Sequence, residues 1–149
     1  EPFFASWPGV TPAGKVCSDI ISFADVLPTC VELAGGQLPA GFKYDGVSFA
    51  PQLRGQPGTP RSYAFVQLGA NWYVRERGYK LNQSGELFDM SDAPFVEKPV
   101  AASADTAESK AARARLLAVL TELNPAGGKT DTNGDAPKQK KKNKQKAKE

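Results

Sequence analysis

The chain alternates between short apolar runs and clusters of turn-forming residues. Residues 2–7 are an apolar run closed by a Pro-Gly pair, which predicts a buried strand entering a turn. Ser22 followed three residues later by Asp25 is typical of a helix N-terminus. The apolar spacing of residues 26–34 continues as a helix, and Gly35 supplies its C-terminal stop.

Beyond this helix the pattern changes twice. Residues 35–60 are rich in Gly and Pro, with a short helical turn ending near Leu53. From residue 61 on, short aromatic-rich runs are separated by hairpin pairs such as Ser84-Gly85. They predict a small antiparallel sheet of four strands at residues 63–66, 72–75, 79–81 and 86–89.

A C-terminal helix follows the predicted sheet. Asp105 and Glu108 have the spacing of a capping box in its Asp variant, and the pair Asn124-Pro125 ends the helix. Its charged residues, Arg113 among them, are expected to be mostly solvated. One face should pack on the sheet as core. That face is predicted to consist of Ala112, Leu116, Val119, Leu120 and Leu123.

The charge of the chain is concentrated at its C-terminal end. The net charge is +3, but residues 129–149 carry 8 Lys against 3 acids, so the remaining residues sum to −2. The Lys-rich tail, residues 126–149, is predicted to be disordered because it has no aromatic or β-branched apolar residues and cannot bury enough surface. It is either a solvated extension or a contact for a polyanion. No aromatics stand among its lysines, so we expect no nucleic acid partner.

Composition limits the chemistry that the chain can perform. It contains no histidine, which excludes Ser-His and Cys-His pairs and any His-bearing metal site within the chain. Cys17 and Cys30 are predicted to be buried free thiols, with a single bridge as the alternative. No apolar run is long enough to suggest a membrane span. Because the first residue is Glu1 rather than Met, we expect the start to be a truncation or a processing scar.

Several segments, in this order and at these separations, resemble the sulfatase family of the alkaline-phosphatase superfamily. The resemblance covers roughly residues 2–98, and only the turn at residues 91–95 departs from the family pattern. The segments are Trp7-Pro8-Gly9, Pro12-Ala13-Gly14, residues 22–29, Leu33-Ala34-Gly35, Leu38-Pro39, residues 45–49, Leu53-Arg54-Gly55, Pro60-Arg61, Val74-Arg75, residues 78–81 and residues 85–89.

The resemblance implies an α/β fold with α+β character in this portion. Residues 1–60 would be the C-terminal end of the large α/β domain. Residues 61–125 would be a smaller subdomain, in which a four-stranded antiparallel sheet is covered by a helix. Residues 126–149 would be the disordered basic tail.

The family's chemistry is expected outside this chain. Sulfatases use a formylglycine nucleophile made from a Cys or Ser signature, with calcium held by Asp, Asn or Gln oxygens and with Lys and His around the sulfuryl group. Residues 109–113 match that signature formally, but they lie in the predicted helix, and neither Cys17 nor Cys30 matches it. We therefore predict no catalytic and no metal-binding residue in this chain, and its substrate-binding residues are unknown.

The remaining polar candidates favour structural roles. Asp45, before Gly46, is read as a turn former rather than a metal ligand. Arg75 and Arg77 flank a hairpin, where pairing with Glu76 or Glu86 is favoured over sulfate binding.

One loop is the best place for substrate contact. Residues 67–72 form a Gly-containing loop whose Asn71 and Trp72 could line a pocket rim, although packing of Trp72 under the sheet is favoured. Asn82 begins a formal glycosylation sequon.

These observations predict a fragment of a sulfuric ester hydrolase of the arylsulfatase type that is inactive alone. Its parent would act on a small-molecule or saccharide sulfate ester outside the cytoplasm, in the periplasm or after secretion. Two alternatives stay open: a phosphodiesterase or phosphonate hydrolase of the same superfamily, and a non-catalytic polyanion-binding module that uses the Lys-rich tail. The sequence carries no information on oligomeric state.

Overall fold

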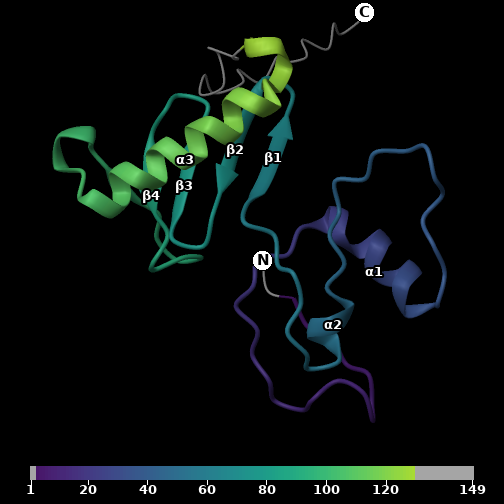
Figure 1. Cartoon of the computed structure of the whole chain (residues 1–149). Helices are drawn as coiled ribbons and strands as arrows, with labels where there is room; N and C mark the ends of the chain where they lie inside the picture. Colours follow the sequence, from purple (N-terminus) through teal and green to yellow (C-terminus); the bar gives the residue numbers. More distant parts are fainter. Residues whose placement is uncertain (1–2, 130–149) are drawn as a thin grey trace, which may run out of the picture.

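The computed structural model describes residues 3–129 of the chain (Figure 1). Residues 3–60 contain two short helices and a 3-10 turn, and the sheet and the long helix follow. The bounds are η1 Phe23–Asp25, α1 Val26–Leu33, α2 Ala50–Leu53, β1 Ala64–Leu68, β2 Asn71–Arg75, β3 Tyr79–Asn82, β4 Leu87–Asp89, β5 Lys98–Val100, η2 Ala102–Ala104, α3 Ala107–Leu123 and η3 Pro125–Gly128.

The helix predicted after Ser22 forms, preceded by a 3-10 turn. Ser22 is the N-cap of η1, and its amide donates a hydrogen bond to the Asp25 carboxylate. The chain continues directly into α1, which ends before Gly35, where a positive φ of 70° suits a residue without a side chain. The expected helical turn near Leu53 is α2.

The five strands form an antiparallel meander in the order β1-β2-β3-β4-β5. The four predicted strands are all present, but the predicted number was too small because β5 was missed. This strand has three residues and contains Pro99. Proline cannot donate to a ladder and is confined to strand edges, which is the position that β5 occupies. A proline in so short a run hid the strand from pattern reading.

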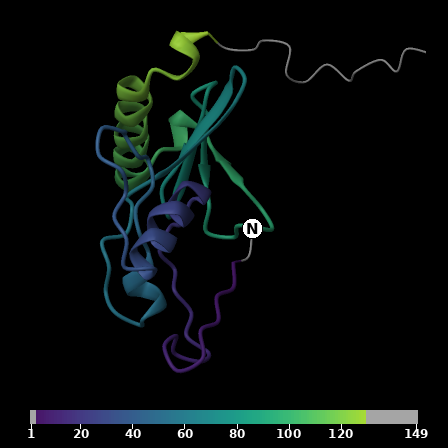
Figure 2. The ribbon, with the colours of Figure 1, turned by 90° about the vertical axis from the view of Figure 1, so that its right-hand side faces the viewer.

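Helix α3 runs along one face of the sheet, as Figure 2 shows from the side. Val74, Leu81 and Leu87 stand in one cross-strand row beneath it. These side chains form a buried cluster with Leu116 of α3. Most of the predicted helix face is therefore core, but Leu123 at the end of α3 is 39% exposed.

The start of α3 differs from the predicted capping box by one residue. Thr106 is the N-cap, and its hydroxyl accepts a hydrogen bond from the Ser109 amide. Asp105 instead accepts hydrogen bonds from Ser109 Oγ and from Arg113 Nε. Arg113 was predicted to be solvated, but it also donates to the carbonyl oxygens of two residues outside α3, Gly85 and Val100.

The predicted N-terminal strand is absent from the described residues. Residues 3–7 are irregular and exposed, and Phe4 is 89% exposed. A strand needs a neighbour for its backbone groups, and none lies beside this run in the described part of the chain. Phe3 does make an edge-to-face contact with Phe49, at 5.6 Å between ring centroids.

Two further predictions concern the ends of the subdomains. The boundaries at residues 60 and 125 remain predictions. Most of the predicted disordered tail lies outside the described residues, but Pro125–Gly128 form the short turn η3. Within residues 3–129 no helix is long and apolar enough to cross a membrane.

Candidate functional site

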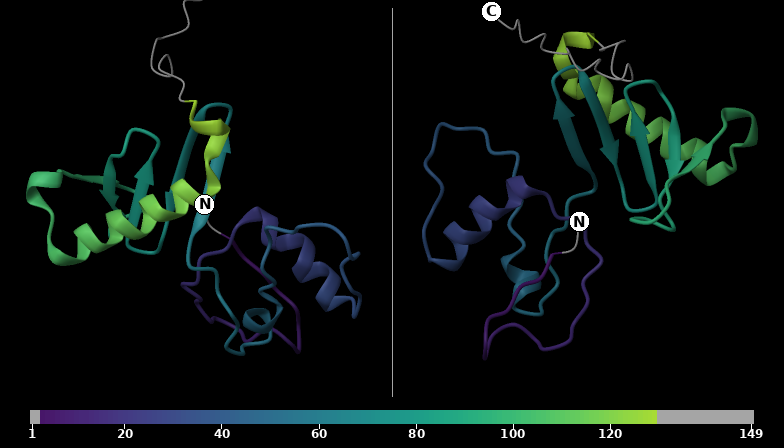
Figure 3. Two further views of the ribbon diagram at one scale, coloured as in Figure 1. Left: turned by 45° about the horizontal axis from the view of Figure 1, so that its top comes forward. Right: turned by 180° about the vertical axis from the view of Figure 1, so that it is seen from behind.

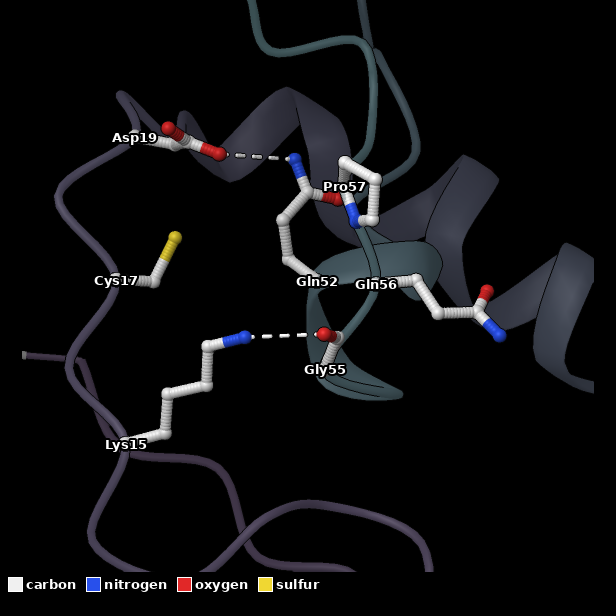
Figure 4. A pocket seen from close by; sticks show the side chains of 7 residues that line it. All are labelled: Lys15, Cys17, Asp19, Gln52, Gly55, Gln56 and Pro57. Carbon is white, nitrogen blue, oxygen red and sulfur yellow. Dashed lines mark hydrogen bonds between the residues drawn. The ribbon is translucent and has the colours of Figure 1, made fainter.

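A hollow of about 350 Å³ lies between the segment before η1 and the turn after α2 (Figure 4). Lys15 Nζ donates a hydrogen bond to the Gly55 carbonyl oxygen at 3.0 Å. Gln52 Nε2 donates to Asp19 Oδ2 at 3.2 Å across the opposite end. These two bonds tie the N-terminal segment to α2 and leave the exposed Cys17 between them.

The hollow has little of what a catalytic site requires. A thiol attacks as the thiolate and needs an adjacent base or a lowered pKa. Within residues 3–129, no hydrogen-bonded base accompanies Cys17, and the carboxylate of Asp19 is engaged by Gln52. Gln52 Oε1 is buried without a hydrogen-bond partner. The described residues that line the hollow therefore provide no nucleophile paired with a base.

The most developed polar cluster of the described residues is centred on Asp25. Its buried carboxylate accepts hydrogen bonds from the amides of Ser22 at 2.7 Å and Val47 at 2.8 Å. Arg61 donates to it through Nε at 2.9 Å and also through Nη2. Arg61 further donates to the carbonyl oxygens of Asp45 and Tyr63. One ion pair thus joins η1 to the segment that enters β1.

The electrostatics of this pair favour the charged carboxylate. Burial raises the pKa of Asp25, but the hydrogen bonds from Arg61, Ser22 and Val47 and the positive charge of Arg61 outweigh it. The pKa of Asp25 therefore lies below its ordinary value. A carboxylate that is ionised and fully hydrogen-bonded is suited to holding structure, not to accepting a proton near neutral pH.

The formal nucleophile signature lies inside α3. Ser109 is buried and serves the helix cap through Thr106, while Arg113 binds Asp105. Both cysteines are free, but both are exposed, so the prediction that they are buried was wrong. Cys30 lies on α1, a short helix that the described residues leave uncovered on one side, which is why an apolar position there is accessible.

Asp45 does not form a turn. It lies in an irregular segment, where its carbonyl oxygen accepts from Arg61 at 3.0 Å. The neighbouring Gly46 passes so close to η1 that a Cβ there would be 2.1 Å from the Ala24 carbonyl oxygen. The Asp-Gly pair is explained by this close approach, which sequence reading mistook for a turn signal.

The predicted partners of the hairpin arginines were also wrong. Glu76 binds Arg115 of α3 at 2.8 Å, so it is not available to the hairpin. Glu86 accepts from Asn82 at 2.8 Å. Arg77 is exposed, and Arg75 Nε is buried without a partner among the described residues.

The loop at residues 67–72 is a hairpin rather than a pocket rim. Trp72 is 7% exposed and packs on the α3 side of the sheet, as favoured. Its neighbour Asn71 accepts a hydrogen bond from Gln83 Nε2 at 3.1 Å. Asn82 of the sequon accepts from the amides of Ser84 and Glu86, so its side chain shapes the turn.

The described residues also bear on where a cation could bind. They contain no group of three or more His, Cys, Asp or Glu side chains that could hold a metal ion. The carboxylates of Asp25 and Asp105 are engaged instead with Arg61 and Arg113. These two carboxylates could serve as cation ligands only by giving up their ion pairs.

No family model matches the chain. The similar proteins reported next are all described as sulfatases. An ulvan-active sulfatase of Formosa agariphila is 41% identical over 108 residues, which cover 66% of this chain and 21% of that protein. Human arylsulfatase D is 36% identical over 83 residues, 52% of this chain and 14% of that protein. Bovine arylsulfatase A is 43% identical over 65 residues, 44% and 12% of the two chains.

The chain is related to the sulfatases. It corresponds to a C-terminal portion of a sulfatase and spans about a seventh to a fifth of the length of the first two relatives. A crystal structure of a protein from Bacteroides thetaiotaomicron assigned to the sulfatases has 27% sequence identity and a TM-score of 0.48, and the match covers 67% of this chain and 24% of that one.

Sequence reasoning missed the two arginines that organise this sulfatase portion. Arg61 and Arg113 bind carboxylates 36 and 8 residues away, respectively. The signal for Arg61 was present, because its Pro-Arg pair and the segment around Asp25 were both among the family-like segments. No local rule links two residues so far apart in the chain.

Proposed function

We propose that this chain is a scaffold-forming part of a sulfuric ester hydrolase whose catalytic residues lie outside it. The observation that carries the proposal is the identity of 36–43% to three sulfatases, together with described residues that include no nucleophile-base pair or cation-binding cluster. The whole protein would cleave a small-molecule or saccharide sulfate ester. The chain itself would support the fold in which that chemistry occurs.

Formylglycine and calcium belong to the proposed parent, not to this chain. Bound calcium would supply charge stabilisation at the sulfuryl oxygens. Asp25 and Asp105 are committed to structural ion pairs, and we assign no acidic side chain of residues 3–129 to the cation. Hydrolysis of sulfate esters is favoured over phosphodiester or phosphonate hydrolysis, because the relatives compared are sulfatases. An extracytoplasmic location remains part of the same proposal.

Exposed apolar side chains support the role of a part within a larger fold. Residues 3–60 bury few apolar side chains, whereas the sheet and α3 hold most of the core. Large apolar residues on the surface of a monomer mark contact areas when they gather in one region. Among residues 3–129, ten of the sixteen large exposed apolar side chains precede residue 60: Phe3, Phe4, Trp7, Val10, Val16, Phe23, Val26, Leu27, Phe42 and Val47.

The test compares this chain with a longer product of its gene. We expect the purified 149-residue chain to release no sulfate from 4-nitrocatechol sulfate above buffer, and a product extended upstream of Glu1 to release it. Bis(4-nitrophenyl) phosphate, assayed in parallel, separates sulfatase from phosphodiesterase activity. Turnover of the sulfate ester by the short chain, or preference of the long product for the phosphodiester, would overturn the proposal.

A further inference from the structure

The sheet has a second face, which α3 does not cover. Seen from behind, the strands lie in front of α3, with no helix over them (Figure 3, right). Val74, Leu81 and Leu87 form the buried row that faces α3. Because side chains alternate between the two faces along each strand, the residues next to these three point to the open face. The pairing places one row across this open face: Ala64, Arg75, Lys80, Phe88 and Pro99.

Two cations stand directly opposite each other in this row. Arg75 and Lys80 are cross-strand partners, and like charges in such a position destabilise a sheet. Arg75 makes no ion pair within residues 3–129, and its Nε is buried without an acceptor. A buried donor left without a partner also costs free energy. The repulsion between the two cations would be offset by an anion bound at this position.

Two aromatic rings lie close to the second cation, Lys80. Lys80 Nζ lies 4.8 Å from the centroid of the Phe88 ring and 5.3 Å from that of Tyr73. Only 15% of the Lys80 side chain is exposed, and its amine contacts the Glu97 carboxylate. The open face thus combines an unpaired guanidinium, a partly neutralised ammonium and two flat apolar rings.

We propose that this open face, built from Arg75, Lys80, Tyr73 and Phe88, binds a sulfated saccharide. The choice of ligand rests on the proposed function. A sulfate ester stays ionised at all physiological pH values and presents several acceptor oxygens to the planar fork of Arg75. The C–H face of a sugar ring packs on aromatic side chains such as Tyr73 and Phe88.

The acidic residues beside the open face argue against a polyphosphate partner. Glu97 contacts Lys80, and Asp92 contacts Lys98 at the neighbouring edge. A nucleic acid backbone with closely spaced phosphates would approach these carboxylates, while a single sulfate placed at Arg75 would not need to.

The test uses the full 149-residue chain and a κ-carrageenan tetrasaccharide, whose charge comes from sulfate esters alone. Binding is followed by NMR titration at low ionic strength, with the desulfated tetrasaccharide as the ligand control. We expect Arg75→Gln to weaken binding about tenfold or more, as for loss of a hydrogen bond to a charged group. Arg77→Gln removes the same charge from the exposed hairpin nearby and should change binding by less than about twofold.

A second variant keeps the test decisive if Arg75→Gln fails to fold. Glu97→Gln removes the carboxylate that competes for Lys80 and should strengthen binding severalfold, a gain that misfolding cannot produce. Equal affinity of R75Q and R77Q, equal binding of the desulfated sugar, or equal competition by a single-stranded oligonucleotide would overturn the site. Loss of binding on removal of residues 130–149 alone would do the same.

Failure of the proposed binding site can be distinguished from failure of the proposed function. If the longer gene product cleaves sulfate esters but R75Q binds normally, the open face is wrong and the function stands. If R75Q loses binding but no sulfate ester is cleaved, the binding site stands without the hydrolase.

Discussion

The ion pair between Asp25 and Arg61 should be the main electrostatic support between η1 and the entry to the sheet. Arg61→Met keeps an unbranched apolar stem but removes the guanidinium with its charge and donors. The side chains are only 3% and 11% exposed, so water can replace little of what is lost. Breaking a buried pair by removing one partner costs about 3–5 kcal/mol because the other charge is left without compensation.

The structure places the expected cost within that range. The amides of Ser22 and Val47 still bind the carboxylate in the variant, which favours the lower end. Two carbonyl oxygens, those of Asp45 and Tyr63, lose their donor and add to the cost. We therefore expect about 3–4 kcal/mol, a large share of the stability of an ordinary domain.

Urea denaturation followed by tryptophan fluorescence measures this cost. Trp7 lies before η1 and Trp72 in β2, so Trp72→Phe leaves a reporter for the N-terminal residues. Arg54→Gln is the matched control, because its pair with Glu32 is 34% and 43% exposed and such pairs contribute about 0–1 kcal/mol. A cost for R61M no larger than that for R54Q would refute the reasoning.

The pH dependence gives an independent check. The folded-state pKa of Asp25 is lowered, so its contribution is present above the unfolded value of about 3.9 and is lost as the pH falls through the folded value. In R61M burial is no longer offset by the guanidinium. The stability difference between wild type and R61M should therefore be largest near neutral pH and shrink below about pH 4; a constant difference would contradict the assignment.

Two further predictions concern the core and the exposed apolar surface. Leu116→Ala should cost about 2–5 kcal/mol in urea denaturation because Leu116, on the sheet-facing side of α3, is 1% exposed. Leu117→Ala, at a side chain that is 56% exposed, should change the stability by less than about 0.5 kcal/mol, and similar costs for the two variants would contradict the assigned helix face. Phe23→Ser should change the stability of this chain by less than about 0.5 kcal/mol, since Phe23 is 90% exposed, but should lower the Tm of the longer gene product. An unchanged Tm in both would argue that Phe23 is not a contact residue.

Local signals predicted the elements that local physics determines. Ser22 and Gly35 bound the first helix because caps and left-handed stops act within a few residues. The hairpin pairs placed the turns between β2, β3 and β4 for the same reason. Strand β5 escaped because its register comes from β4 rather than from its own three residues.

The contacts of charged side chains could not be predicted in this way. Glu76 was expected to pair within its hairpin, but Arg115 reaches it from α3, which follows 39 residues later. Arg61 similarly binds Asp25 across 36 residues. Which of several nearby charges forms a pair depends on how the elements pack, and pattern reading contains no information on that geometry.

The apolar run at residues 3–7 was wrongly predicted to be a strand, but its apolar composition still needs an explanation. Its residues form no strand in the described structure, yet Phe3, Phe4 and Trp7 remain 57%, 89% and 42% exposed. Exposing such side chains costs free energy, at about 25 cal/mol for each Å² of apolar area left in water. The proposed function accounts for this pattern, because an apolar run evolves for the environment of the complete protein. On that view the run contacts residues of the whole protein that lie outside this chain.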